Sequence, residues 1–557
     1  MRLNIFAVAG LCSVGLAKAS DDRNLRGGQD VLSVETETKR VAIIGAGAGG
    51  SSAAYHLRQY AAKAGSNVNI TVYERNPYIG GRSTTVNVYD DPNEPVELGA
   101  SIFVKINKIL VDAAESFNLS TNSIRNARPR SENSDALGVW NGAHFVFIQS
   151  GSNSWWDIAK LLWKYGLAPI RTNNLMKRTV GKFLQMYEAP HFPWPSLSQV
   201  AFDLGLTAVT AATGKQYLKE NNIDSRFAEE IVQASTRVNY AQNLPLIHGL
   251  ETMVCMATDG AMSVEGGNWQ IFSGMIGAAS AGVRLNTSVV AVEKQRDGTY
   301  AVLSKLASAV EVSPTDNTAV EVFDSVIIAG PLQFSNIKIA DIESADVEST
   351  SPLRHLPDAI PYVQLHVTLF TSKHPLYPPA FNQPLDKPLP NTILTTLQPH
   401  EHLGTNPDGV GAAGFFSIST LRKTSKGEFL YKIFSPRPVH DSFLHRITGY
   451  TPDESTLENT GSPAITWAYR KVWHSYPYEY PRVTFEELKL DENLWYTSGI
   501  ESFISTMETS ALMGKNIARL VVNEWVEKES QGSMELWERR QHRRMNCGNS
   551  TRCGMRN

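Results

Sequence analysis

A cluster of glycines near the amino end has the spacing that brings a backbone close to a phosphate group. Residues 45–50 read GAGAGG. Gly45 permits a tight turn, Gly47 leaves room for a pyrophosphate, and Gly50 lets a helix pack close to a strand. The helix that follows would point its free N–H groups at the phosphate charge. This spacing predicts a dinucleotide-binding turn.

The elements around these glycines are those that such a turn requires. The apolar residues 41–44 predict a strand before the turn, and the apolar face of residues 53–61 predicts a helix after it. Residues 68–72 alternate as a second strand, so the segment forms one βαβ unit. That strand leads to Glu74, which can accept hydrogen bonds from ribose hydroxyls, with Arg75 beside it as a further cofactor-binding residue. A glycine-rich turn without a ligand is the alternative.

Further glycines along the chain favour FAD over NAD. Gly80 and Gly81 are followed by Arg82, and Gly99 follows in the sequence ELGA. The glycines would let the backbone pass close to a ribityl chain, and the Arg82 guanidinium can meet a phosphate. Each short motif taken alone is also typical of an ordinary turn. Their order along the chain is what indicates a long, bent dinucleotide.

The carboxyl-terminal part supplies the remaining segments of the same site. Residues 495–501 read WYTSGIE and precede an expected helix at 503–526. We expect this loop, with Gly499 and Glu501, to return to the flavin and ribityl chain. The apolar run 324–331 resembles the internal strand that brings such chains back to the cofactor domain. Four separated segments therefore indicate one bound FAD.

Length and composition indicate a globular protein of more than one domain. The 557 residues carry a net charge of −3, which disfavours nucleic acid as a partner. The predicted fold class is α/β, with a Rossmann-like FAD-binding domain interleaved with a mixed helical and β-sheet substrate domain. The expected segments are a signal peptide (1–19), a flexible lead (20–38), FAD-binding parts (39–110, 285–335 and 491–528), substrate-domain parts (111–284, mostly helical, and 336–490, β-rich) and a polar basic tail (529–557).

The first residues indicate entry into the secretory pathway. Arg2 is followed by the mostly apolar stretch 4–16 and by Ala17-Lys18-Ala19, which fits a cleavage site. A short membrane anchor is the alternative, but the apolar stretch is too short to span a bilayer. Four sequons predict glycosylation where they are exposed: Asn69, inside an expected strand, and Asn118, Asn286 and Asn549. Cys547 and Cys553 could form a disulfide, and no cysteine or histidine spacing predicts a metal site.

Two central stretches resemble those of a known family. Residues 237–242 read RVNYAQ and residues 264–268 read VEGGN. Together with residues 499–502 (GIES) they resemble the prenylcysteine oxidase (farnesylcysteine lyase) family, within the flavoproteins similar to FAD-dependent amine oxidases. Ala241 departs from the family's glycine. The resemblance runs from about Arg40 to about Trp525.

The resemblance implies the chemistry and the location. Its substrate is a cysteine with a farnesyl or geranylgeranyl thioether, which FAD oxidises at the S–CH₂ carbon. Water adds, cysteine and a prenyl aldehyde leave, and molecular oxygen becomes hydrogen peroxide. The location implied is a lysosome or vacuole, or the outside of the cell. The cofactor performs the demanding step, so the catalytic side chains stay unknown.

The substrate site and the function keep several open interpretations. Asn239, Tyr240 and Glu265 could lie near the substrate or form a structural turn. Three tryptophans could line an apolar tunnel, belong to the core, or touch a membrane peripherally: Trp155, Trp156 and Trp163. An ordinary FAD-dependent amine oxidase is the first alternative function. A secreted, non-catalytic interaction protein is the second, which the effector-like residues 23–26 (RNLR) would suit.

Overall fold

A computed structural model of the protein describes residues 38–123, 137–149, 155–307, 318–341, 356–401, 407–450 and 464–550. The expected signal peptide, the RNLR segment and Cys553 lie outside these residues. A six-stranded sheet holds the glycine-rich turn, in the order β20 (Lys489–Asp491), β21 (Leu494–Tyr496), β13 (Ser325–Ile328), β1 (Lys39–Ile44), β2 (Val68–Tyr73) and β9 (Gly282–Arg284). All of its pairs are parallel except β20–β21.

Alternate residues of β1 explain how this sheet becomes a central layer. Val41 and Ile43 pack on the helical side, while Ala42 and Ile44 face the opposite cluster. The helical side holds α1 (Ala48–Ala64), α11 (Trp269–Ala278) and the long α13 (Met507–Ser550). The other side holds a four-stranded sheet of β12 (Ala319–Phe323), β11 (Tyr300–Leu306), β10 (Thr287–Lys294) and β14 (Lys338–Asp341). Burial on both faces suits the apolar strands of a parallel sheet.

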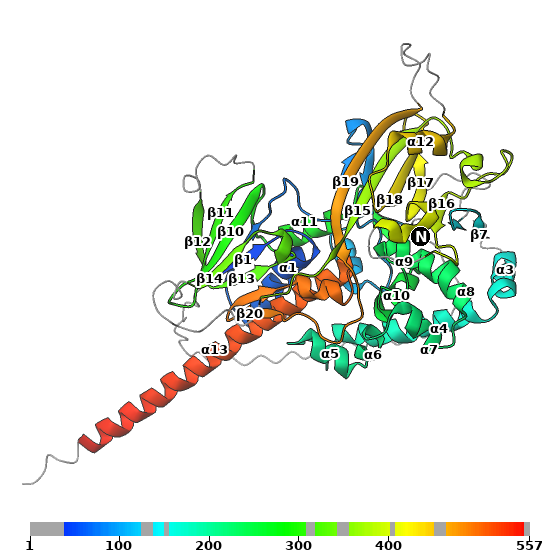
Figure 1. The fold of residues 1–557 in the computed structure, drawn as a ribbon. Helices are drawn as coiled ribbons and strands as arrows, with labels where there is room; N and C mark the ends of the chain where they lie inside the picture. Colours follow the sequence, from blue (N-terminus) through cyan, green and yellow to red (C-terminus); the bar gives the residue numbers. More distant parts are fainter. Residues whose placement is uncertain are drawn as a thin grey trace, which may run out of the picture.

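A second, larger sheet forms the core of the other half of the molecule (Figure 1). Its order is β19 (Ile465–Pro477), β15 (Tyr362–Ser372), β18 (Phe429–Ser435), β17 (Ser417–Lys423), β16 (Thr392–Thr395), β6 (Leu137–Trp140) and β7 (Phe145–Gln149). Helices gather below it: α3 (Trp155–Tyr165), α4 (Ala168–Phe183), α5 (Leu197–Asp203), α6 (Thr207–Thr210), α7 (Gly214–Glu220), α8 (Ser225–Phe227), α9 (Gln233–Tyr240) and α10 (Gly249–Met256). The remaining elements are α2 (Lys108–Ser116), α12 (Asp441–Thr448), β3 (Thr85–Asn87), β4 (Pro95–Glu97), β5 (Thr121–Ser123) and β8 (Met262–Val264).

This architecture confirms the α/β class with a Rossmann-like unit interleaved with a mixed helical and β-sheet unit. Three features differ from the expected segments. The expected FAD-binding part 285–335 divides between two sheets, with β10, β11 and β12 in the four-stranded sheet and β13 in the six-stranded sheet. β9 lies in the parallel sheet before residue 285, because Thr71–Tyr73 of β2 pair with it. α13 continues through Ser550 into the segment expected as a tail. Within the described part of the chain, no helix is long and apolar enough to cross a membrane.

Candidate active site

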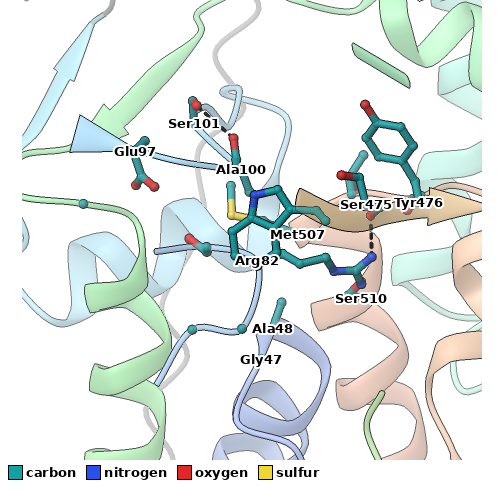
Figure 2. A pocket seen from close by; sticks show the side chains of 18 of the residues that line it. Gly47, Ala48, Arg82, Glu97, Ala100, Ser101, Ser475, Tyr476, Met507 and Ser510 are labelled. Atoms are coloured by element: carbon teal, nitrogen blue, oxygen red, sulfur yellow. Dashed lines mark hydrogen bonds between the residues drawn. The ribbon is translucent and has the colours of Figure 1, made fainter. Parts of the chain in front are cut away.

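One large cavity lies where the glycine-rich turn faces the seven-stranded sheet. It has a volume of about 1330 Å³, above the 300–1,000 Å³ or so of an ordinary ligand pocket. Eight of the ten residues predicted to bind the cofactor line it: Gly45, Gly47, Glu74, Arg75, Gly81, Arg82, Gly99 and Glu501. Figure 2 shows Gly47 and Ala48 at one side of the cavity, with Glu97, Ser101, Ser475 and Tyr476 across from them.

Each glycine of the first turn is required for a different steric reason. Gly45 has a φ of +113°, and a Cβ there would lie 2.7 Å from the carbonyl oxygen of Ala329. A Cβ on Gly50 would lie 1.9 Å from the carbonyl oxygen of Gly45, so helix and strand touch there. A Cβ on Gly47 would meet nothing closer than the Cα of Gly81, 3.9 Å away. The open space at Gly47 therefore faces the cavity, where a pyrophosphate fits.

Glu74, the residue predicted to bind a ribose, is a buried carboxylate beside the first turn. Its Oε2 accepts a hydrogen bond from the Ala46 N–H (2.9 Å), and its Oε1 accepts from the N–H and the side chain of Asn76 (2.8 and 2.7 Å). These bonds fix a buried carboxylate at the end of β2, beside the glycine-rich turn. Arg75 also lines the cavity and donates to the carbonyl of Phe334 at 2.8 Å.

Arg82 and Glu501 form an ion pair that sequence reasoning did not predict, although it named both residues. The two Arg82 Nη atoms lie 2.8 and 2.7 Å from the two Glu501 carboxylate oxygens. Arg82 also donates to the carbonyl of Ser475 at 2.5 Å, the bond drawn in Figure 2. Such a bidentate pair is geometrically specific. It joins the second glycine loop, β19 and the carboxyl-terminal loop at one point of the cavity wall, so Arg82 has partners besides any phosphate.

Two predicted residues serve packing and do not line the cavity. Gly50 allows the close contact of α1 with the first turn. A Cβ on Gly499 would lie 2.9 Å from the Cβ of Glu486. Gly499 is therefore needed because the chain at 486 crosses it, away from the cavity. The motif at 499–502 still contributes to the cavity through Glu501.

A buried lysine and a glutamate face the cavity, and no motif in the sequence indicated either of them. The Lys432 ammonium group donates to the carbonyl of Glu97 (2.8 Å) and to the hydroxyl of Ser101 (2.7 Å). The Glu97 Oε1 accepts from the Asn268 N–H at 2.6 Å, while its Oε2 is buried without a hydrogen-bond partner among the described residues. Burial raises the pKa of Glu97 and lowers the pKa of Lys432, because both lose solvation as ions.

The RVNYAQ stretch divides into a structural part and a cavity part. The Arg237 guanidinium is fully buried and donates to the Asn243 side chain (3.1 Å) and the Val410 carbonyl (2.6 Å). Asn239 and Tyr240, at the end of α9, line the cavity. Ala241 closes the helix with a φ of +54°, a left-handed conformation that glycine adopts more easily. The family's glycine at this position is thereby explained.

The VEGGN stretch forms a turn at the cavity. Glu265, Gly266 and Gly267 line the cavity, and both glycines have positive φ angles of +83° and +122°. The Asn268 side chain accepts from the Val264 N–H (2.8 Å) and donates to the Ala100 carbonyl (2.9 Å). The turn therefore holds the ELGA segment, which begins at Glu97, and it is both a structural turn and part of the cavity wall.

The expected aromatic tunnel is not formed by Trp163. Its side chain is 91% exposed, and it does not line the cavity. The side chains of Trp155 and Trp156 lie outside the described part. The apolar wall comes instead from the seven-stranded sheet and α9–α10, through Leu365, Leu421, Phe434, Trp473, Tyr476, Val238 and Val254.

A fully buried acidic cluster lies behind this wall. Glu251 accepts from the N–H of Ser505, which lines the cavity, at 3.1 Å. Glu479 lies 3.5 Å from the His248 imidazole, and all three ionisable side chains are inaccessible to solvent. Burial is the first cause that raises the pKa of Glu251 to about 8 and of Glu479 well above its ordinary value. Burial also lowers the pKa of His248 to about 3.

These shifts predict that the folded protein loses stability as the solution becomes alkaline. Burial raises the pKa of Glu97 and of Glu508 to about 7, and that of Glu251 to about 8. A carboxyl whose pKa is higher in the folded than in the unfolded state contributes fully to stability at pH values below its unfolded-state pKa. That contribution is lost as the pH rises through its folded-state pKa. Burial lowers the pKa of His56 and of His248, and these two groups make stability rise with pH. They do so only below the unfolded-state histidine pKa of 6.5. We therefore expect the melting temperature to fall between pH 6.5 and pH 8, as measured by thermal scans.

A single variant tests the origin of this slope. Glu251→Gln removes one of the titrating groups and should flatten the fall in melting temperature. Glu115→Gln on α2 is the control, since the Glu115 side chain is exposed and should leave the slope unchanged. A slope that is equal in all three proteins would contradict the assignment.

Comparisons with known proteins agree with this fold. Residues 148–533 match the family model described as prenylcysteine lyase, and residues 43–114 match that of an NAD(P)-binding Rossmann-like domain. Farnesylcysteine lyase of Arabidopsis thaliana is 31% identical, over 89% of this chain and 90% of the relative. Prenylcysteine oxidase 1 of Homo sapiens is 26% identical, over 87% and 89%.

Solved structures share the architecture at low identity. Putrescine oxidase bound to putrescine is 15% identical with a TM-score of 0.52, over 88% of this chain and 100% of that one. A fatty acid isomerase from P. acnes is 12% identical with a TM-score of 0.53, over 86% and 97%. The fold and the matched Rossmann-like domain thus define a dinucleotide-binding protein. Within that class, the chain belongs to the prenylcysteine lyase family.

Proposed function

We propose that the chain is an FAD-dependent oxidase that cleaves S-prenyl cysteine to free cysteine, a prenyl aldehyde and hydrogen peroxide. The observation that carries the proposal is a single cavity with the dinucleotide-binding glycines at one side and an apolar wall at the other. Its volume of about 1330 Å³ leaves room for a second molecule beside a dinucleotide. Family membership assigns that second molecule to the prenylcysteines named in its relatives.

The residues of the cavity fit FAD. Gly47 and Gly81 lie close together at the cavity wall, and neither carries a side chain that would take up space in the cavity, which suits a pyrophosphate. The carboxylate of Glu74 is held at the end of β2 for a ribose. The Arg82–Glu501 pair fixes the loop that precedes α13. FAD, when bound there, supplies the two-electron oxidation of the carbon beside the sulfur, with molecular oxygen as the final acceptor.

The chain's own residues would bind and orient the substrate. Lys432 is a buried cation at the cavity, and it can meet the carboxylate of the cysteine. The Oε2 of Glu97 offers an acceptor to the ammonium group of the cysteine, because it has no partner among the described residues. The apolar wall with Leu365, Phe434 and Trp473 can hold the prenyl chain. Binding at both ends would place the S–CH₂ group between them.

The overall reaction balances with water and oxygen as co-reactants. A thioether, one oxygen molecule and one water give a thiol, an aldehyde and hydrogen peroxide. The oxygen atom of the water becomes the aldehyde oxygen, and the two electrons of the C–H bond go to molecular oxygen. The apolar wall would keep bulk water away while the substrate is bound.

Peroxide production measured over a substrate series tests this function. We expect oxidation of farnesylcysteine and geranylgeranylcysteine, and a stepwise fall in kcat/KM as the chain is shortened. Each buried CH₂ contributes about 0.8 kcal/mol, which corresponds to a factor of about four. Spermine and a simple aromatic amine should react poorly, since neither has a prenyl chain. Activity on the amines without activity on farnesylcysteine would instead assign the chain to amine oxidation.

A location in the secretory pathway completes the proposal, with final residence in a lysosome or vacuole or outside the cell. The amino-terminal sequence motivates it, and the exposed sequons Asn118 and Asn286 are compatible with glycosylation. Amino-terminal sequencing of protein from its native source should begin after Ala19. A cytosolic protein that keeps Met1 would refute the location.

A further inference from the structure

The corner between α3 and α4 exposes two large apolar side chains. Trp163, in the last turn of α3, is 91% exposed, and Leu167, just before α4, is 58% exposed. α3 lies at the outer edge of the helical layer in Figure 1. Residues around them pack inward, including Leu161, Tyr165 and Ala168. Trp163 and Leu167 are therefore not needed for the core of this layer.

The surface around these two side chains is basic. Residues 155–183 contain six lysines and arginines and one acidic residue, although the whole chain has a net charge of −3. The acidic residue, Asp157, is buried, whereas the basic ones on α4 are exposed: Arg171, Lys177, Arg178 and Lys182. We call Trp163, Leu167 and these four basic residues the α3–α4 corner. Its charge complements an anionic surface.

The α3–α4 corner lies one helical layer away from the cavity. The apolar cluster that contains Leu161 and Leu175 also packs against Val238 and Ala257. Val238 and Ala257 in turn line the cavity. The helical layer thus carries the α3–α4 corner on its outer surface and forms part of the cavity wall on its inner surface.

We propose that the α3–α4 corner docks the protein on an anionic lipid surface, with Trp163 and Leu167 entering the interface between headgroups and acyl chains. Tryptophan favours this interface, and basic side chains on the same helices add attraction to anionic lipid. Two projecting apolar side chains within a basic surface suit a lipid interface. They do not suit a stable protein interface, because that would need about 800 Å² from each partner.

Vesicle binding by the full-length, cofactor-loaded protein tests the proposal. Vesicles of phosphatidylcholine alone and of phosphatidylcholine with phosphatidylserine are mixed with protein and floated through a density gradient. We expect binding to the anionic vesicles that weakens with added salt. The double variant W163S/L167S should bind about tenfold more weakly, because it removes the inserted apolar area. The double variant K177Q/R178Q should lose about fivefold per removed charge at low salt.

Leu306→Ser is the matched control. Leu306 on β11 is an apolar side chain that is 61% exposed and lies on the four-stranded sheet in the other half of the molecule (Figure 1), so its variant should bind as the wild type does. The proposal is overturned if the wild type does not bind anionic vesicles, or if L306S loses as much binding as W163S/L167S. Self-association that W163S/L167S abolishes, without vesicle binding, would assign the corner to a second copy of the chain. Vesicle flotation needs no turnover, so its failure is distinguishable from failure of the peroxide assay.

Discussion

Gly47→Val is expected to give a folded protein that contains no flavin. In the structure a Cβ at this position would have no protein atom closer than 3.9 Å. The backbone at Gly47 has φ −79° and ψ −170°, an extended conformation that valine adopts readily. The branched side chain would instead occupy the space that faces the cavity, where the pyrophosphate would lie. Flavin absorbance per protein should fall to zero, while circular dichroism stays that of the wild-type apoprotein.

Gly50→Val is the comparison that separates loss of the cofactor from loss of the fold. A Cβ on Gly50 would lie 1.9 Å from the carbonyl oxygen of Gly45, so this variant should lose its fold together with its flavin. Gly47→Ala should retain part of the flavin, because one methyl group fills less of the same space. A Gly47→Val protein that purifies with a full complement of flavin would show that the dinucleotide lies elsewhere.

The residues whose place at the cavity could be predicted from the sequence share one property, which is that local structure decides that place. The turn at Gly45 and Gly47 and the carboxylate of Glu74 belong to one βαβ unit, in which strand, turn and helix are consecutive. Gly499 had the same kind of local motif, yet its role is set by Glu486, which only the folded chain brings against it. The motif at 499–502 therefore indicated that a glycine is required at position 499, but not which residue packs against it.

The residues that could not be predicted depend on contacts between distant segments. Lys432 and Glu97 are 335 positions apart, and Arg82 and Glu501 are 419 apart. No pattern in a single sequence pairs residues at such separations. Trp163 shows the same limit for burial, because the sequence allowed tunnel, core and surface alike. Only the packing of α3 and α4 exposes it.

Arg237→Met is expected to cause the largest loss of stability among substitutions in the substrate half. The fully buried guanidinium donates to the side chains of Thr395 (3.2 Å) and Asn243 (3.1 Å) and to the carbonyl of Val410 (2.6 Å). Methionine fills much of the space but leaves these acceptors unpaired. Leaving a buried acceptor without its donor costs about 1–3 kcal/mol for each group. Burial lowers the pKa of Arg237 to about 9, so the guanidinium is charged at neutral pH.

The position of Arg237 predicts an effect on the substrate as well. α9 carries Arg237 at one point and the cavity residues Asn239 and Tyr240 two and three positions later. Loosening the contact with Val410 should shift this wall, so KM for farnesylcysteine should rise while flavin content stays near normal. Denaturant unfolding measures the stability, and peroxide assays measure KM.

Arg58→Met is the matched control for this double effect. Arg58 also donates to two backbone carbonyls, those of Ala279 (2.8 Å) and Val68 (2.7 Å), but in the dinucleotide-binding half. Its loss should lower stability and flavin retention and leave KM of the loaded enzyme unchanged, because neither carbonyl belongs to the apolar wall. If Arg237→Met raised KM no more than Arg58→Met does, α9 would not be the element that positions the substrate. If it left stability unchanged, the buried guanidinium would not be what joins α9 to the segment at 409–410.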